Sequence, residues 1–291
     1  MAILKPDIHS NEYISGDFFE SLCDIDTEQN KDWIKSIELE QHKVLTIFIQ
    51  THELNKIIPV LCGINKEFVV VSHNSAGNVQ YDDSERDFDY TWKPVGNVSH
   101  WYCQNMLIAE KNVTPIPLGF ENSLISFSLN KKAFVNEIAK SKTIKELKLL
   151  ICYNPITNLG ERVQPFELFI NKPWATIMSG FNHQSLMREY FDALSKHQFV
   201  LCPAGTGIDT LRIWEALYTG SIPIVKENAF TNYFKARLPI IVVNEWHDIT
   251  IELLIDKYNE MSKTIYNWDI LKKSYWGYRI ISKKYELMNM D

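Results

Sequence analysis

Strand-like and helix-like segments alternate along the whole chain, and this alternation constrains the fold more than any other feature. Val44–Ile49 and Glu67–Ser72 are short and rich in β-branched residues, which is typical of buried strands. Leu54–Cys62 and Asp209–Tyr218 have the apolar spacing of helices, although Pro59 would kink or end the first of them. Strands separated by helices predict parallel sheets in an α/β protein.

The same patterns predict the remaining elements and two domains. Further strands are expected at Val98–Cys103, Val113–Leu118, Leu147–Cys152, Gln198–Cys202, Ile222–Val225 and Ile240–Val243. Further helices are expected at Lys132–Lys148, Arg162–Ile170, His183–Lys196, Ile249–Lys263 and Asp269–Met288. The polar segment His73–Asn97 predicts a loop. Because 291 residues exceed the ~150 of one average domain, we expect two doubly wound domains, at 1–135 and 136–268, and a final helical segment at 269–291.

The composition excludes several classes of protein. Apolar residues make up 45% and charged residues 23%, which is the balance of a globular chain and not of a disordered one. The formal net charge of −6 disfavours nonspecific binding to nucleic acid, which needs a basic surface. The longest apolar stretches are shorter than the ~18 residues of a membrane span, and MAILKPDIHSNE lacks a signal-peptide core. We therefore expect a cytoplasmic protein with no nucleic-acid partner and no membrane span.

Phe199–Val225 carries the most information about function. It predicts a strand, a loop with Gly205 and Gly207, a helix that begins near Asp209, a tight turn and a second strand. Ligands of parallel α/β sheets gather at the carboxyl ends of the strands, and the two glycines let the backbone approach a ligand. An anion fits the free N–H groups at the start of the helix. Asp209 is the expected N-cap there, and Thr206 is the competing candidate.

Arg212 and Glu215 lie three residues apart on one face of this predicted helix. A cation at that place can hold a diphosphate, and a carboxylate can accept hydrogen bonds from two ribose hydroxyls, as a nucleotide-sugar site requires. The alternative is an exposed i,i+3 ion pair without a function. GxGxxG is not present, because Thr210 stands where its third glycine would be, and no GxxxxGK[ST] occurs either. This disfavours nicotinamide dehydrogenases and P-loop enzymes.

The same stretch resembles the nucleotide-sugar-binding segment of exostosin-type glycosyltransferases, family 47. The residues that carry the resemblance are Leu201, Pro203, Gly205, Arg212, Glu215, Ala216, Gly220, Ile222, Pro223 and Ile224. Downstream, LPIIVVNEWHDI is similar to the family's strand that ends before a Trp. In the first half, VSHNSAGNV, WYCQNM and IPLGFENS look like short virus- or alga-type members of the group.

This resemblance implies a GT-B fold, in which two Rossmann-like domains face a central cleft. The first domain would bind the acceptor, the second would bind the donor, and the final helix would cross back to the first. The resemblance also implies an inverting transfer without a bound metal. It favours a UDP-sugar donor, with UDP-xylose as the first guess, and a carbohydrate or glycoprotein glycan as the acceptor. Gly207 stands where many retaining GT-B enzymes have the first Glu of a Glu-x7-Glu pair, which also favours inversion.

Candidate site residues follow from these positions. For the donor we expect contacts from Asn154, Arg162, Gly205, Thr206, Gly207, Asp209, Arg212 and Glu215, with Lys226 as a further phosphate candidate. An inverting transfer needs a general base for the acceptor hydroxyl. His73 at a strand end is the first candidate, although it could instead only hold a loop, and Glu121 is the second. For the acceptor we expect polar contacts from Asn74 and Asn122, with Trp101 and Tyr102 as stacking faces.

Two Asp-x-Asp triplets, Asp24–Asp26 and Asp87–Asp89, are the only ones that could place a metal on a diphosphate. Neither ends an apolar strand, and the five cysteines form no CxxC pair. We therefore expect no metal and no cofactor apart from the nucleotide sugar. Two other functions stay open. One is a nucleotide-sugar enzyme of another chemistry, such as an epimerase, and the other is a catalytically silent sugar-binding protein.

Overall fold

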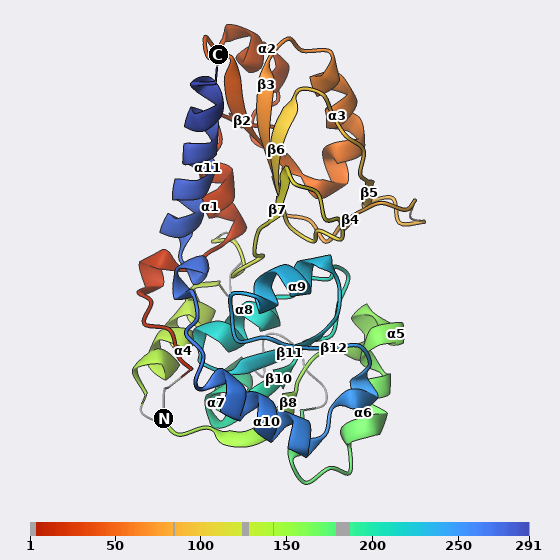
Figure 1. The fold of residues 1–291 in the computed structure, drawn as a ribbon, viewed down its shortest axis with the longest axis vertical. Coiled ribbons are helices and arrows are strands. Elements are labelled where there is room, and N and C mark those ends of the chain that lie inside the picture. The colour runs from red at the N-terminus through yellow and green to blue at the C-terminus, as the bar shows by residue number, and fades with distance from the viewer. Residues whose placement is uncertain (1–3, 84, 124–127, 142, 179–186, 291) are drawn as a thin grey trace. The chain divides into compact units, whose positions relative to one another are not determined.

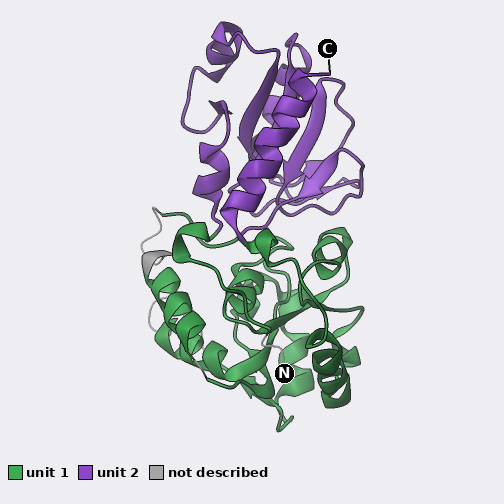
Figure 2. Ribbon diagram, turned by 60° about the vertical axis from the view of Figure 1, so that its left-hand side comes forward, with its two compact units in different colours: residues 1–13, 119–271 green, residues 14–118, 272–291 purple. Residues whose placement is uncertain are grey.

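Two five-stranded parallel sheets organise the chain, and each lies at the centre of its own unit (Figure 2). The computed structural model describes residues 4–83, 85–123, 128–141, 143–178 and 187–290. Unit 1 consists of Met1–Tyr13 and Gly119–Leu271, and unit 2 of Ile14–Leu118 and Lys272–Asp291. The predicted α/β class with parallel sheets is confirmed, because every strand pair in both sheets is parallel.

The sheet of unit 2 follows the order of the chain. Its strands are β1 (Ile25–Asp26), β2 (Val44–Gln50), β3 (Glu67–His73), β6 (Val98–Cys103) and β7 (Val113–Pro115). The order β1-β2-β3-β6-β7 contains no reversal, so this sheet differs from the doubly wound order that we expected. Two short strands in the predicted loop, β4 (Val79–Gln80) and β5 (Tyr90–Thr91), pair with each other.

Helices cover both faces of this sheet (Figure 1). They are α1 (Gly16–Ser21), α2 (Trp33–Leu39), α3 (Leu54–Cys62) and α11 (Lys273–Met288). Helix α11 packs on β2 and β3, and its fully buried side chains include Trp276 and Ile280. A ring contact of 6.5 Å between the Trp276 and Phe19 centroids joins α11 to α1. The last segment of the chain therefore completes the core of unit 2.

The sheet of unit 1 has the order β12-β11-β10-β8-β9. The strands are β8 (Glu146–Ile151), β9 (Ala175–Ile177), β10 (His197–Leu201), β11 (Ile222–Lys226) and β12 (Ile241–Val243). After β8, the next strand in the chain, β9, pairs with one side of β8 and forms an edge of the sheet. The following strands, β10 to β12, are added one after another on the opposite side of β8. Because β-α-β connections are right-handed, the helices of the two directions lie on opposite faces. The strand order thus reverses between β8 and β10, as in a doubly wound sheet.

Most helices of unit 1 overlap the expected ones and differ from them at the ends, whereas one, α9 (Ala229–Lys235), was not expected from the sequence. The others are α4 (Ser128–Lys140), α5 (Leu159–Arg162), α6 (Gln164–Phe169), α7 (Met187–Lys196), α8 (Leu211–Tyr218) and α10 (Ile251–Met261). The helix expected at Arg162–Ile170 is two helices, because Pro165 lies in the first turn of a new one. The predicted helix start at His183 lies outside the described residues. No described helix combines the length and apolarity that crossing a bilayer needs.

The first residues of the chain pack within unit 1. The Tyr13 ring contacts the rings of Phe120 and Tyr218 at centroid distances of 5.1 and 4.6 Å, and its hydroxyl donates to Asn136 Oδ1 at 2.9 Å. Gly220 ends the turn after α8 with a φ of 76°, and an added Cβ would lie 3.1 Å from the Leu4 carbonyl. Along the chain the units divide after Tyr13, Leu118 and Leu271, whereas the patterns suggested boundaries after residues 135 and 268.

Candidate functional site

The reversal between β8 and β10 marks the first place to look for a ligand in unit 1. In open α/β sheets, ligands bind outside the carboxyl ends of the strands where the order reverses. Cys152–Asn154 follow β8, and Cys202–Gly207 follow β10. Since β8 and β10 are neighbours in register, these two loops leave the sheet side by side. Of the donor residues expected from the sequence, Asn154, Gly205, Thr206 and Gly207 lie in these two loops.

Arg162 holds the two loops together. Its guanidinium donates to the carbonyl oxygens of Ala204 at 2.9 Å, Asn154 at 3.0 Å and Pro203 at 3.3 Å, and to Thr157 Oγ1. Burial, together with the charge of Arg212, lowers the pKa of Arg162 to about 10. All three of its nitrogens donate within the protein. These bonds use four of the five N–H groups of the guanidinium, so Arg162 positions the loops, and the contact with phosphate expected from the sequence stays a prediction.

The loop after β10 fits closely around this arginine. A Cβ on Gly205 would lie 2.7 Å from Arg162 Nη2, so a larger residue would push the guanidinium out of place. The loop closes on itself through Gly205 N, which donates to Gly207 O at 2.9 Å, while Thr206 is exposed at its tip. Asn154 stabilises the neighbouring loop, because its Oδ1 accepts from Ile156 N at 3.0 Å.

The start of α8 differs from the prediction. The helix begins at Leu211, its N-cap is Thr210, and no side chain caps it. Asp209 is buried and accepts a hydrogen bond from Trp214 Nε1 at 2.8 Å. Neither Asp209 nor Thr206 is the N-cap, because the carboxylate of Asp209 is held by an indole and Thr206 is four residues too early.

Arg212 has an unusual environment for a buried cation. Its side chain is 8% exposed, and it makes no hydrogen bond or ion pair with any described residue. Its Nε is fully enclosed, and so are the Tyr153 hydroxyl and Thr210 Oγ1, which likewise have no partner among the described residues. The Arg212 guanidinium lies 5.8 Å from the centre of the Tyr153 ring. Buried polar groups almost always have partners, so three such atoms at one strand edge indicate a site for a polar, anionic ligand.

Glu215 lies in a charged cluster that the sequence did not predict. Its carboxylate is 3% exposed and lies 3.1 Å from Lys131 Nζ, and it accepts a hydrogen bond from the Tyr190 hydroxyl at 2.9 Å. Lys131 also lies 3.0 Å from Glu121 Oε1. Burial alone would raise the pKa of Glu215, but the charges of Lys131 and Arg212 and the Tyr190 hydroxyl more than offset it, so this pKa is below its usual value.

This cluster changes the interpretation of the glutamates. Arg212 and Glu215 are both buried, so the alternative of an exposed ion pair is wrong. Glu121, together with Asn122, belongs to unit 1, and it shares Lys131 with Glu215. Nothing in the sequence distinguishes Lys131 from the other lysines of its charged segment. Lys226 is also engaged, because its Nζ lies 3.4 Å from Glu161 and 3.2 Å from Glu245.

His73 in unit 2 is enclosed. Its side chain is 1% exposed, Nδ1 lies 3.0 Å from Asn74 Oδ1, and Nε2 lies 3.2 Å from the Pro117 carbonyl oxygen. Burial lowers the pKa of His73, so the ring is neutral. Both neighbouring atoms are acceptor oxygens, so a neutral ring can donate to only one of them, and the Asn74 side chain covers Nδ1. This geometry favours the alternative in which His73 and Asn74 hold the loop after β3.

Trp101 and Tyr102 are core residues and do not offer stacking faces. Both are 2% exposed on β6. Trp101 Nε1 donates to Ser72 Oγ at 2.8 Å, and the Tyr102 hydroxyl donates to the Arg279 carbonyl at 3.0 Å. Of the polar residues around them, Ser99 and His100 lie in β6 itself, and Gln104 and Asn105 lie in the turn that follows.

The acidic triplets make contacts within the protein. Asp24 accepts from Thr46 N at 2.7 Å and pairs with Lys284, and Asp89 accepts from Asn78 N at 2.8 Å. Among the described residues, no group of three or more His, Cys, Asp or Glu side chains is arranged to hold a metal ion.

Comparison with known proteins shows similarity to a protein family and to solved structures. Residues 169–267 match the family described as RXYLT1 C-terminal domain, which is xylosyltransferase-related. The matched span lies entirely in unit 1 and includes β10, α8 and β11, so it supports a glycosyltransferase through the unit that contains Arg212. A solved structure, described as "Crystal Structure of alpha1,3-Fucosyltransferase", is similar with 13% sequence identity and a TM-score of 0.38. That similarity covers 85% of this chain and 90% of the other.

Proposed function

We propose that the protein is a glycosyltransferase that binds a nucleotide-diphosphate sugar at the carboxyl edge of the unit 1 sheet. The observation that carries this proposal is Arg212, a buried guanidinium without a partner among the described residues, next to the glycine loop after β10. A diphosphate would supply the negative charge and the acceptor oxygens that this group lacks. The family match over residues 169–267 supports the same unit as the donor site.

The side chains at this edge have distinct roles in the proposed reaction. Arg212 neutralises charge on the diphosphate, which becomes the leaving group when the bond to the sugar breaks. Arg162 keeps the loops after β8 and β10 in place, so that their backbone groups meet the nucleotide. Glu215 binds the ribose hydroxyls, and for this it exchanges its hydrogen bond from Tyr190 while Lys131 keeps the carboxylate ionised.

We further propose a UDP-sugar donor, with UDP-xylose as the first to test, and inverting transfer to a glycan hydroxyl without a metal ion. In a GT-B arrangement, unit 2 would bind the acceptor. The general base stays open between His73 and Glu121. His73 would have to expose Nδ1 by releasing Asn74, and Glu121 would have to leave Lys131.

Calorimetric titration tests the donor site directly. The probes are UDP and UDP-xylose, with GDP as the competing nucleotide. Replacing Arg212 with Met removes at least one charge-assisted hydrogen bond, so we expect about ten- to a hundredfold weaker binding of UDP. Arg237→Met is the matched control, because Arg237 lies in the same unit and already donates to the Tyr233 carbonyl. Equal UDP affinity in Arg212→Met and wild type would refute the proposed donor site.

A further inference from the structure

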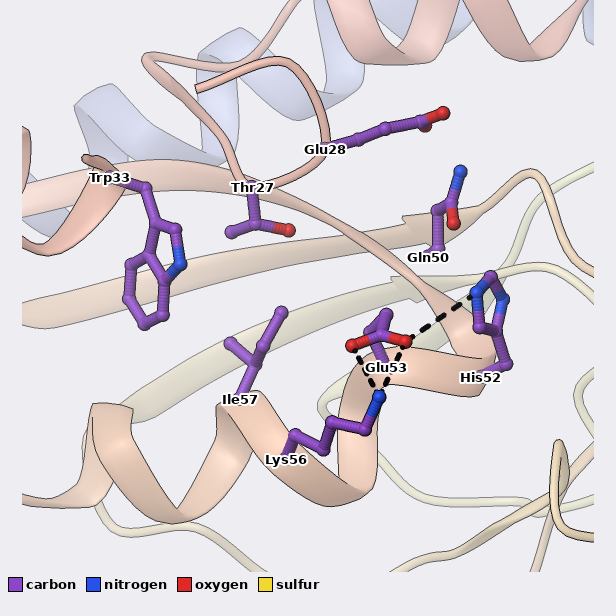
Figure 3. A pocket seen from close by; sticks show the side chains of 8 residues that line it. All are labelled: Thr27, Glu28, Trp33, Gln50, His52, Glu53, Lys56 and Ile57. Atoms are coloured by element: carbon purple, nitrogen blue, oxygen red, sulfur yellow. Dashed lines mark hydrogen bonds and ion pairs between the residues drawn. The ribbon is translucent and has the colours of Figure 1, made fainter. Parts of the chain in front are cut away.

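Unit 2 contains a pocket whose lining includes none of the site residues considered so far (Figure 3). Its volume is about 420 Å³, which is within the range of small-molecule sites. The lining residues come from the segments that follow β1 and β2 and from α2 and α3, and they are Thr27, Glu28, Trp33, Gln50, His52, Glu53, Lys56 and Ile57. The pocket therefore lies at the carboxyl ends of two parallel strands, in a sheet whose strand order does not reverse.

One wall and the floor of this pocket are apolar. The Trp33 indole is half-buried at one end of the pocket, and Ile57 forms the floor between Trp33 and the polar residues (Figure 3). Trp33 is the first residue of α2, so the helix fixes the position of its backbone. An indole held in this way offers a flat apolar face to a ligand and keeps its N–H available for a hydrogen bond.

Polar groups converge on the pocket from the opposite end. The Gln50 side chain and the Glu28 carboxylate make no hydrogen bond or ion pair with a described residue, and the same holds for Trp33 Nε1. Their backbones are nonetheless fixed. Gln50 pairs with His73 at the end of β2, and Glu28 N donates to Asp26 Oδ1 at 2.8 Å. The backbones of Gln50 and Glu28 are thus fixed, and their planar side-chain groups have no partner among the described residues.

The charges of the pocket restrict the ligand. Lys56 and Glu53 form an ion pair of 2.9 Å at its edge, and His52 lies 3.6 Å from the same carboxylate. Glu28 adds a second carboxylate, so the lining carries more negative than positive charge when His52 is neutral. A phosphate or a sugar acid would be repelled there, whereas a neutral polyhydroxyl ring would not.

We propose that this pocket binds a neutral pyranoside ring. The ring stacks its C–H face on Trp33, and its hydroxyls exchange hydrogen bonds with Gln50, Glu28 and the Trp33 N–H. A flat apolar wall facing planar amide and carboxylate groups is suited to a ring with apolar faces and hydroxyls at its edge. The binding of a pyranoside ring in this pocket is independent of the proposed function. The assignment of this ring as the acceptor end of a glycan rests on the proposed function.

The test uses methyl β-D-xylopyranoside and methyl β-D-galactopyranoside with the full chain labelled with ¹⁵N. The indole N–H signal of Trp33 is assigned by its absence in Trp33→Phe. We expect this signal to shift in a saturable way with a Kd on the order of 1 mM, as is usual for a ligand of this size. Gln50→Ala should weaken binding about two- to tenfold, because one neutral hydrogen bond is lost. Trp33→Ala should weaken it more than tenfold.

Trp92→Ala is the matched control, because Trp92 is a half-buried tryptophan of the same unit outside the pocket. It should leave the glycoside affinity unchanged. A silent Trp33 signal, equal affinity in Trp33→Ala and Gln50→Ala, or stronger binding of methyl glucuronide or uridine would overturn the proposal. UDP titrated into the same sample distinguishes the two sites. UDP binding without a glycoside response refutes the pocket alone, and a glycoside response without UDP binding refutes the donor site alone.

Discussion

Replacing Arg212 with Met should separate stability from ligand binding. The ligand-free protein bears the cost of an enclosed Nε–H without a partner among the described residues, about 1–3 kcal/mol. Met has similar length and no charge, so this cost disappears. The variant loses the attraction between Arg212 and Glu215, but no nitrogen of Arg212 lies within 4 Å of that carboxylate, which keeps Lys131 and Tyr190. We therefore expect Arg212→Met to be between 0 and about 2 kcal/mol more stable than wild type.

Differential scanning calorimetry with and without UDP measures both effects. A domain the size of unit 1 shifts its Tm by about 2–4 °C for each kcal/mol, so the ligand-free variant should melt at the wild-type Tm or up to roughly 8 °C higher. At a UDP concentration of 100 times the wild-type Kd, the wild type should gain about 2.7 kcal/mol. The variant, with its ten- to hundredfold weaker binding, should gain only about 0.4–1.4 kcal/mol.

Arg162→Met provides the contrast in the same experiment. Arg162 donates to four oxygens of the loops that follow β8 and β10, so its loss should destabilise the protein by about 3–5 kcal/mol. If Arg212→Met instead unfolds at least 3 °C below wild type and UDP stabilises it as much as it stabilises wild type, then Arg212 is a structural residue and our reasoning about its missing partners is wrong.

Three further predictions concern a shared cation, a buried histidine and the geometry of a guanidinium. Lys131→Met leaves the carboxylates of Glu121 and Glu215 without their shared cation, and we expect urea unfolding to show about 3 kcal/mol of destabilisation. Adding Glu215→Gln to this variant should restore part of the lost stability. Burial, with the nearby positive charges of α11, lowers the pKa of His100 to about 4. The unfolded state therefore binds more protons than the folded state below pH 6.5, and the free energy of unfolding falls as the pH drops from 6.5 to 4. Wild type should lose ~1–2 kcal/mol more than His100→Gln between pH 7.5 and pH 5 in urea titrations, and equal losses would contradict this. Arg162→Lys should lower both the Tm and the UDP affinity in thermal-shift titrations, because a single ammonium cannot reach four oxygens arranged around a planar guanidinium.

The parts of the fold that could be predicted from the sequence are those that local patterns determine. Val98–Cys103 and Leu54–Cys62 have the predicted bounds, because a buried strand and an amphipathic helix each have a short repeat. The strand Ala175–Ile177 was not predicted, because it is three residues long and only half-buried. The different strand orders of the two sheets also escaped prediction, since a strand pattern does not specify its neighbours.

The contacts of the candidate site could not be predicted from local sequence patterns either. Arg162 and Arg212 look equivalent in the sequence, because both follow a strand and lie in a helix. Only the folded chain gives one of them four oxygen partners and leaves the other with none among the described residues. Lys131 lies more than 80 residues from Glu215 in the sequence, so no local spacing could relate them. Trp33 and Gln50 were not considered because their segments match no motif.

The assignment of α11 to unit 2 has a consequence for synthesis on the ribosome. The β2 and β3 strands are made early, but the helix that packs on them, with Trp276 and Ile280, is made after all of unit 1. About 170 residues separate Leu118 from the end of α11, which at typical elongation rates takes on the order of 10–30 s. During that time the apolar face that α11 covers is exposed, while unit 1 already has all of its segments. Unit 1 can therefore finish folding first, although most of unit 2 emerges before it, and the nascent chain has an aggregation-prone surface that chaperones would need to cover.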